Sequence, residues 1–141
     1  MILEATHINK EKEKEIDNLV GKAFGFIKSI KLGGIGSRRM ILKDCSEKIK
    51  ERLYTFRDIK YVSLELRPSG ILVHFNQSFR NYIWVIPYYK LVVYLADGFS
   101  VHADGNFLSV DNNNMLRDNK SFIRKMMLQK QHYLKANNFN L

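Results

Sequence analysis

The sequence has few of the features that usually indicate a compartment or a membrane anchor. It holds one cysteine, Cys45, in 141 residues, which excludes a disulfide framework and agrees with a reducing compartment. No apolar run approaches the roughly 20 residues that span a bilayer, and the first residues lack the basic start and apolar core of a signal peptide. We therefore expect one domain over residues 1–141, located in the cytoplasm and without a transmembrane segment.

Strong catalytic and ligand-binding motifs are also missing. The glycines of Gly33–Ser37 lack the following Gly-Lys-Ser/Thr of a phosphate loop, so a turn is favoured there. His102 and Asp104 lie two residues apart on one predicted strand, and His74 would join them only if the strand register allowed it. The place of Cys45 on an apolar stripe favours a small buried side chain over a nucleophile. We expect no catalytic residue, metal or cofactor, and a role other than catalysis is favoured.

The chain carries a net charge of +9, and the excess of basic over acidic residues lies in its two flanking segments. Residues 1–58 hold 13 Lys/Arg against 9 Asp/Glu, a balance of +4, and residues 117–141 hold 6 against 1, a balance of +5. Residues 59–116 hold 4 of each and are neutral. A basic excess of this kind raises the chance of a polyanionic partner, although a solvated basic surface is the favoured interpretation.

The neutral segment predicts an antiparallel meander of five to six strands over residues 59–110. Tyr61–Arg67 alternates apolar and polar residues, Arg67–Gly70 is a turn with proline second and glycine fourth, and Ile71–Asn76 resumes the alternation. Tyr82–Ile86 is apolar on both faces, and Pro87 marks a strand end, a bulge or an edge. Further strands are expected at Tyr88–Leu95, Phe99–Ala103 and Phe107–Val110, with Asp97-Gly98 and Asp104-Gly105 as hairpin turns.

The flanking segments have helical periodicity. Asn9–Leu32 predicts an amphipathic helix with Asn9 as N-cap and Ile27 and Ile30 on its apolar face. A second helix is expected from about Ser37 to Phe56, within a helical segment 9–57. The alternative begins this helix at Asp44 and makes Arg39–Lys43 a short strand. A C-terminal helix is predicted over residues 118–136, so the fold class is α+β.

Two groups of residues are candidate binding sites. Tyrosine and tryptophan are enriched at protein interfaces, so the aromatic strand residues predict a surface for a protein partner or for self-association: Tyr82, Trp84, Tyr88, Tyr89 and Tyr94. The basic segments are the candidate site for an anionic surface, either lipid headgroups or nucleic acid: Lys28, Lys31, Arg38, Arg39, Arg124 and Lys125.

The order of elements over residues 59–136 resembles a pleckstrin-homology-like domain. The run Trp84-Val-Ile-Pro-Tyr-Tyr-Lys-Leu91, the hairpin at Asp97-Gly98 and the helix around Phe122 to Leu134 are similar to bacterial members of that family. The resemblance implies a meander curled into a barrel, closed by the C-terminal helix, and a binding or scaffolding module rather than an enzyme. The family has seven strands where six are expected here, unless Arg39–Lys43 supplies the missing one. No lipid-binding signature carries over.

Overall fold

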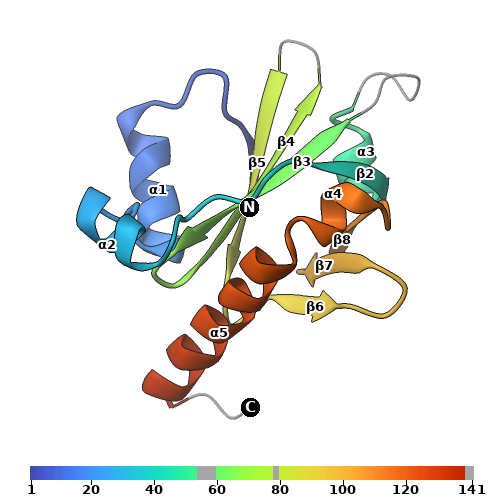
Figure 1. Ribbon diagram of the computed structural model, residues 1–141. Helices are drawn as coiled ribbons and strands as arrows, with labels where there is room; N and C mark the ends of the chain where they lie inside the picture. The colour runs from blue at the N-terminus through green and yellow to red at the C-terminus, as the bar shows by residue number, and fades with distance from the viewer. Residues whose placement is uncertain (54–59, 78–79, 139–141) are drawn as a thin grey trace.

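A computed structural model describes residues 1–53, 60–77 and 80–138 (Figure 1). Within these residues the chain is α+β, with one open antiparallel sheet of eight strands in the order β1-β5-β4-β3-β2-β8-β7-β6, so the sheet is not closed into the barrel that the resemblance implies. The strands are β1 Ile2–Glu4, β2 Met40–Cys45, β3 Tyr61–Arg67, β4 Gly70–Gln77, β5 Arg80–Pro87, β6 Val92–Tyr94, β7 Phe99–Ala103 and β8 Asn106–Val110. The helices are α1 Lys10–Val20, α2 Phe26–Lys31, α3 Glu47–Lys50, α4 Asn114–Arg117 and α5 Lys120–Ala136.

The β3-β4-β5 ladder agrees closely with the predicted strands. β3 has the predicted bounds, and the turn at Pro68 joins it to β4 with Arg67 opposite Gly70. β5 ends at Pro87, as expected of a residue that cannot donate to a ladder. From Tyr82 onward its residues are buried on both faces because each face has a separate covering layer.

The hairpins of β6, β7 and β8 turn at the two predicted Asp-Gly pairs. Asp104 and Gly105 have φ of 51° and 78°, which suits a two-residue hairpin turn. The predicted strand Tyr88–Leu95 is shorter than expected and reduces to β6. The reason is a turn after Pro87, in which the amide of Lys90 donates to the Pro87 carbonyl at 3.0 Å.

The sheet is larger than the predicted five to six strands because two strands were not expected in the leading interpretation. β2 occupies the N-terminal half of the predicted helix Ser37–Phe56, so that half was wrong and the strand alternative at Arg39–Lys43 was close. β2 pairs with β3 at Met40 and with β8 at Leu42, Asp44 and Cys45, and so joins the two halves of the sheet. Helix α3 follows it and ends at Lys50, short of the predicted end at Phe56, and residues 54–59 lie outside the described residues. β1 pairs with β5.

The predicted helix Asn9–Leu32 is two helices. Asn9 caps α1 as expected, its side-chain oxygen accepting a hydrogen bond from the Lys12 amide at 2.8 Å. Gly21, with φ of 86°, ends α1 and lies so close to Pro68 that a Cβ would be 3.0 Å from the proline ring. The chain therefore changes direction after α1, and α2 does not continue the apolar face that was predicted for it.

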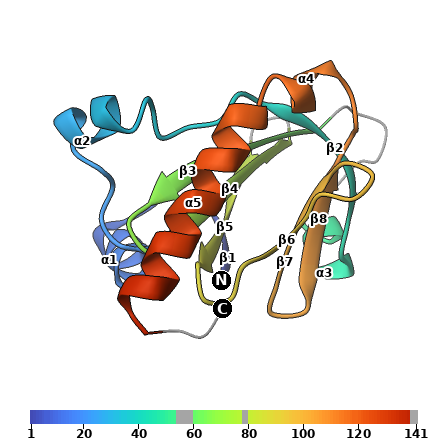
Figure 2. The ribbon, with the colours of Figure 1, turned by 60° about the horizontal axis from the view of Figure 1, so that its bottom comes forward.

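Two apolar layers lie on opposite faces of the β4-β5 region. The main core is enclosed by the inner faces of both halves of the sheet and by α5, and includes Trp84, Phe75 and Met126. The smaller α1 core packs Ile16 and Val20 on Leu72, Ile83 and Val85. Figure 2 shows α5 crossing one side of the sheet while α1 lies on the other. The predicted C-terminal helix of residues 118–136 is present as α5.

Candidate functional site

Helix α2 presents the most exposed large apolar side chains of the described chain. Phe26, Ile27 and Ile30 are 81%, 70% and 64% exposed, and no residue of α2 is buried. Ile30 follows Phe26 by one helical turn, so the two side chains share a face. Lys28 and Lys31, both exposed, lie on the same short helix. We call Phe26, Ile27, Lys28, Ile30 and Lys31 the α2 surface.

The end of α2 is fixed to α5 by one lysine. Gly33 and Gly34 have φ of 76° and 99°, and their amides donate to the carbonyls of Ile30 and Ser29, which terminates the helix. Lys125 Nζ then donates to the carbonyls of Gly33 and Gly34 at 3.2 and 2.8 Å. The segment that begins at Gly33 is therefore the turn that was predicted, and the carbonyls of Gly33 and Gly34 accept hydrogen bonds from the Lys125 ammonium group.

Asn119 binds the backbone of Arg38, in the loop that follows the turn at Gly33 and Gly34. Asn119 is buried, and its side chain accepts from the Arg38 amide at 2.9 Å and donates to the Arg38 carbonyl at 3.2 Å. The two attachments hold the loop after α2 against the first half of α5, and α2 itself projects at the edge of the molecule (Figures 1 and 2).

The structure brings most of the predicted basic residues onto neighbouring elements. Lys28 and Lys31 lie on α2, Arg38 in the loop attached to Asn119, and Arg124 and Lys125 on α5. Arg39 sits apart, its guanidinium 4.2 Å from the centre of the Tyr61 ring. No acidic residue occurs from residue 18 to residue 43 or after Asp118. The positive potential of these elements is therefore not offset by acidic residues within the same segments.

Three of the five candidate aromatic residues are core residues. Tyr82, Trp84 and Tyr88 are 5%, 1% and 0% exposed. The Tyr82 ring stacks on Phe75 with centroids 5.5 Å apart, and the Tyr88 hydroxyl donates to the Arg67 carbonyl at 3.2 Å. Burial raises the pKa of the Tyr88 hydroxyl. These three side chains are covered within the fold.

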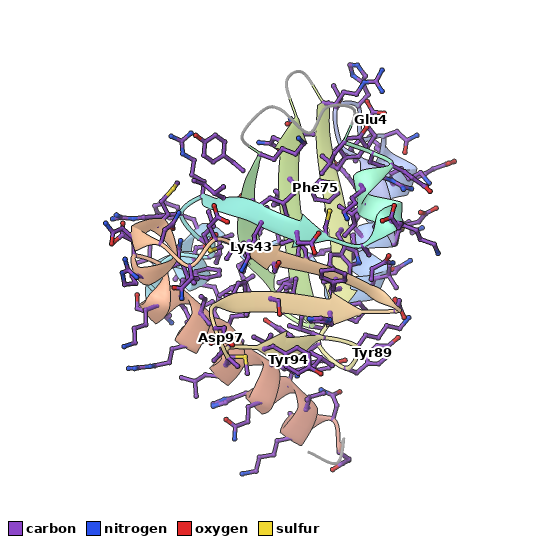
Figure 3. The ribbon with its side chains drawn as sticks, turned by 90° about the vertical axis from the view of Figure 1, so that its right-hand side faces the viewer. Glu4, Lys43, Phe75, Tyr89, Tyr94 and Asp97 are labelled. Atoms are coloured by element: carbon purple, nitrogen blue, oxygen red, sulfur yellow. The ribbon has the colours of Figure 1, made fainter. Side chains whose placement is uncertain are left out.

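The other two aromatic residues remain at the surface near β6, the last strand of the sheet. Tyr89 and Tyr94 are 52% and 55% exposed, and Val92 and Leu95 beside them are 45% and 55% exposed. Figure 3 shows Tyr89 and Tyr94 at this end of the sheet. We call Tyr89, Val92, Tyr94 and Leu95 the β6 edge. The ring of Tyr94 also meets His102 edge-on, with centroids 4.7 Å apart.

The histidines that were considered for a metal or acid–base site do not converge. His74 lies on β4 and His102 on β7, with β3, β2 and β8 between them in the sheet. Asp104 pairs with Lys90 at 3.2 Å. Within the described ranges no three His, Cys, Asp or Glu residues are grouped closely enough to hold a metal ion. Cys45 is buried, and burial raises the pKa of its thiol, which disfavours the reactive thiolate.

His74 belongs instead to an ion-pair network beside a cavity of about 530 Å³. Its Nε2 lies 3.4 Å from Glu65, whose other carboxylate oxygen accepts from Arg67 at 2.6 Å. Arg67 also pairs with Asp17 of α1 at 3.2 Å and donates to the Gly21 carbonyl at 2.9 Å. Glu65 and Arg67 thus form an ion pair on one face of β3, and the network ties α1 to the sheet.

Among the helices of the described residues, none combines the length and the apolar character that a bilayer crossing requires. Comparisons of the chain with models of protein families, with curated proteins and with solved structures find no match.

Proposed function

We propose that this chain is a non-enzymatic, cytoplasmic module that binds the surface of anionic membranes through α2. The observation that carries the proposal is the α2 surface itself, where three large apolar side chains point into solvent beside two lysines. A short helix with an apolar face and a basic face is the form in which peripheral proteins enter the headgroup region.

The energies of this contact favour a bilayer over nucleic acid. Moving a Phe or Ile side chain fully out of water contributes about 1.5–3 kcal/mol, and each Lys near an anionic bilayer about 1 kcal/mol. Nucleic acid would use the lysines and could stack on Phe26, but it offers no apolar medium to Ile27 and Ile30. The basic residues Arg38 and Arg124, on elements attached beside α2, add to the attraction of an anionic surface.

We also propose that the chain is a pleckstrin-homology-like module. The seven strands from β2 to β8, found among the described residues, followed by the amphipathic helix α5, support this because they supply the strand that the sequence left missing. In this interpretation β1, α1 and α2 are additions to the pleckstrin-homology-like fold, and α2 is the addition that contacts the membrane.

Vesicle co-sedimentation tests the proposal. Wild-type protein should bind vesicles of phosphatidylcholine and phosphatidylserine, bind pure phosphatidylcholine weakly, and be released by salt. Ile27→Ser/Ile30→Ser should weaken binding about tenfold or more, and Lys28→Glu/Lys31→Glu should act similarly. The matched controls are Val92→Ser, an exposed apolar residue elsewhere, and Lys10→Glu/Lys14→Glu, exposed lysines on α1.

Two results would contradict the proposal. One is the absence of binding to phosphatidylserine vesicles at low salt. The other is equal loss of binding in the α2 variants and their controls, which would indicate non-specific charge attraction. Tighter binding to single-stranded RNA than to vesicles, unaffected by Ile27→Ser/Ile30→Ser, would favour a nucleic-acid partner instead.

The β6 edge favours a second candidate function, which is self-association or binding of a protein partner. β6 lies at the end of the sheet, and its exposed Val92, Tyr94 and Leu95 offer apolar area beside a strand edge. Sedimentation velocity over a concentration series should then detect a dimer that Tyr94→Glu abolishes. A monomer at all concentrations would remove self-association.

A further inference from the structure

A second cavity lies between α5 and the loop that joins β6 to β7. Its volume is about 640 Å³, within the range of small-molecule sites. Its apolar wall consists of Leu95, Phe99, Leu116, Ile123 and Met127. None of its lining residues belongs to α2, so an inference from this α5 cavity is independent of the membrane contact proposed above.

Three cations and no carboxylate complete the lining of the α5 cavity. Arg117, Lys120 and Arg124 are exposed residues at the end of α4 and along α5. Lys120 and Arg124 are four residues apart and therefore share one side of the helix. The Asn114 side chain accepts hydrogen bonds from Arg117 at 2.6 and 3.2 Å, which orients its guanidinium. An apolar wall and a basic rim are thus presented by one site.

The backbone around the cavity is held by hydrogen bonds that do not use the side chains of its apolar wall or of its basic rim. Asn113 caps α4 through a hydrogen bond from the Leu116 amide at 3.2 Å, and Asn119 fixes the α4–α5 junction to Arg38. On the opposite side, Gly98 adopts a φ of 133°, a conformation that allows the tight turn after Asp97. The cavity is therefore bounded by elements whose backbone these contacts hold in place.

We infer that the α5 cavity binds a single-chain lipid amphiphile with an anionic headgroup. The acyl chain would lie against Phe99, Ile123 and Met127, and the headgroup would meet Arg117, Lys120 and Arg124. Arginine pairs with carboxylate and phosphate alike through two parallel hydrogen bonds, so a fatty acid and a lysophospholipid share the required chemistry. A neutral lipid of the same chain length would leave the cations without a partner.

Isothermal titration calorimetry with the full chain tests this inference, using monomeric laurate and lauroyl lysophosphatidate as separate probes. At least one probe should bind at one molecule per chain, and the tighter of the two identifies the headgroup. Monolauroylglycerol, which has no charge, should bind about tenfold more weakly. Acetate and inorganic phosphate, which have no chain, should show no binding.

Matched variants locate the site. Leu95→Glu and Lys120→Glu should each weaken binding about tenfold or more, because the first places a carboxylate in the apolar wall and the second replaces a cation of the basic rim by a carboxylate. Leu128→Glu and Lys135→Glu make the same changes at exposed positions of α5 outside the cavity, and should leave affinity within about twofold.

The outcomes are separable from those of the proposed function. Ile27→Ser/Ile30→Ser should lose vesicle binding and keep amphiphile binding, since α2 does not line the cavity. Absence of stoichiometric binding for both probes would overturn the inference. Equal affinity for the neutral lipid, or equal weakening by the cavity variants and their controls, would overturn it as well.

Discussion

Trp84 lies in β5 with its side chain 1% exposed in the main core, opposite Val73 of β4 and Ile2 of β1. Trp84→Ala would leave a cavity that fixed strands on both sides cannot close, so we expect a loss of about 3–5 kcal/mol in unfolding free energy. Urea denaturation followed by circular dichroism measures it. Tyr89→Ala, at a half-exposed aromatic, is the control and should change stability by less than about 0.5 kcal/mol. A fully stable Trp84→Ala protein would contradict the packing described for this residue.

Glu65 gives the protein a specific acid sensitivity. Partial burial raises the pKa of this carboxyl, but the hydrogen bonds from His74 and Arg67 and the charge of Arg67 outweigh burial and hold the pKa below its usual range. A carboxyl whose pKa is lower in the folded than in the unfolded chain stabilises the fold at pH values above the unfolded pKa of about 4.3. This contribution disappears as the pH falls through the folded pKa.

We therefore expect Glu65→Gln to lower the urea midpoint near neutral pH and to remove part of the decline in stability below about pH 4.3. The wild-type and variant curves should converge in acid. Glu51→Gln changes an exposed carboxyl outside the Glu65 network, and it should leave the wild-type pH profile in place. Parallel profiles for wild type and Glu65→Gln would contradict the assignment.

At the scale of elements, the contact between α1 and the sheet depends on the missing side chain of Gly70. A Cβ at this position would lie 2.4 Å from both the Ile86 carbonyl oxygen and Val20 Cγ1. The Ile86 oxygen belongs to the backbone of β5, and Val20 is the fully buried last residue of α1. The close approach of α1 to the turn at Gly70 therefore leaves no room for even a methyl group.

Gly70→Ala should cost about 1–3 kcal/mol or more, because α1 or β5 must shift to relieve the overlap. Gly25→Ala is the matched control, since a Cβ at Gly25 meets no atom within 4 Å, and its cost at this N-cap should stay within about 1 kcal/mol. Thermal unfolding of both variants measures the difference. Equal stability of the two would show that α1 packs less closely than described.

The α2 surface arises from an element boundary that periodicity could not detect. Ile27 and Ile30 continue the apolar spacing of α1, so the sequence predicts that they are buried on one long helix. Gly21 turns the chain at a positive φ, and after that turn the same spacing faces solvent. The basic residues of the candidate site were predictable from composition, whereas the exposure of its apolar residues depended on this one turn.

At the scale of the whole molecule, the two apolar layers share strands β4 and β5. Leu72 and Trp84 lie on opposite faces of these adjacent strands, one in the α1 core and one in the main core. Loss of either layer exposes strands that the other layer needs. We therefore expect the described fold to unfold as one cooperative unit.

Leu72→Ala tests this coupling, because it damages the α1 core and leaves Trp84 in place as the fluorescent reporter of the main core. Stability should fall by about 2–5 kcal/mol, with the midpoint from Trp84 fluorescence shifting together with that from circular dichroism. If circular dichroism changed at a lower urea concentration than fluorescence, the α1 layer would be an independent unit.

The predictable parts of the fold are those whose structure is determined by residues close together in the sequence. β3, β7 and α5, together with the turns at Pro68 and the two Asp-Gly pairs, follow from period and turn chemistry within a few residues. β2 does not, because Ile41, Cys45 and Ile49 recur at helical spacing, although Ile41 and Cys45 lie on the bulged strand β2 and Ile49 on α3. What makes it a strand is the pairing with β3 and β8, and β8 is distant in the sequence.

The position of β2 also determines the order in which the sheet can be completed. β2 is an inner strand, but the Ser109 hydroxyl and the Asp44 carbonyl that it bonds are separated by 65 residues. One side of β2 therefore has no strand to pair with until the chain has been synthesised through β8. Closing so long a loop places folding in the slow range of mixed and all-β domains, on the order of milliseconds to seconds. During that interval the nascent β2 edge is a surface on which chains can associate wrongly.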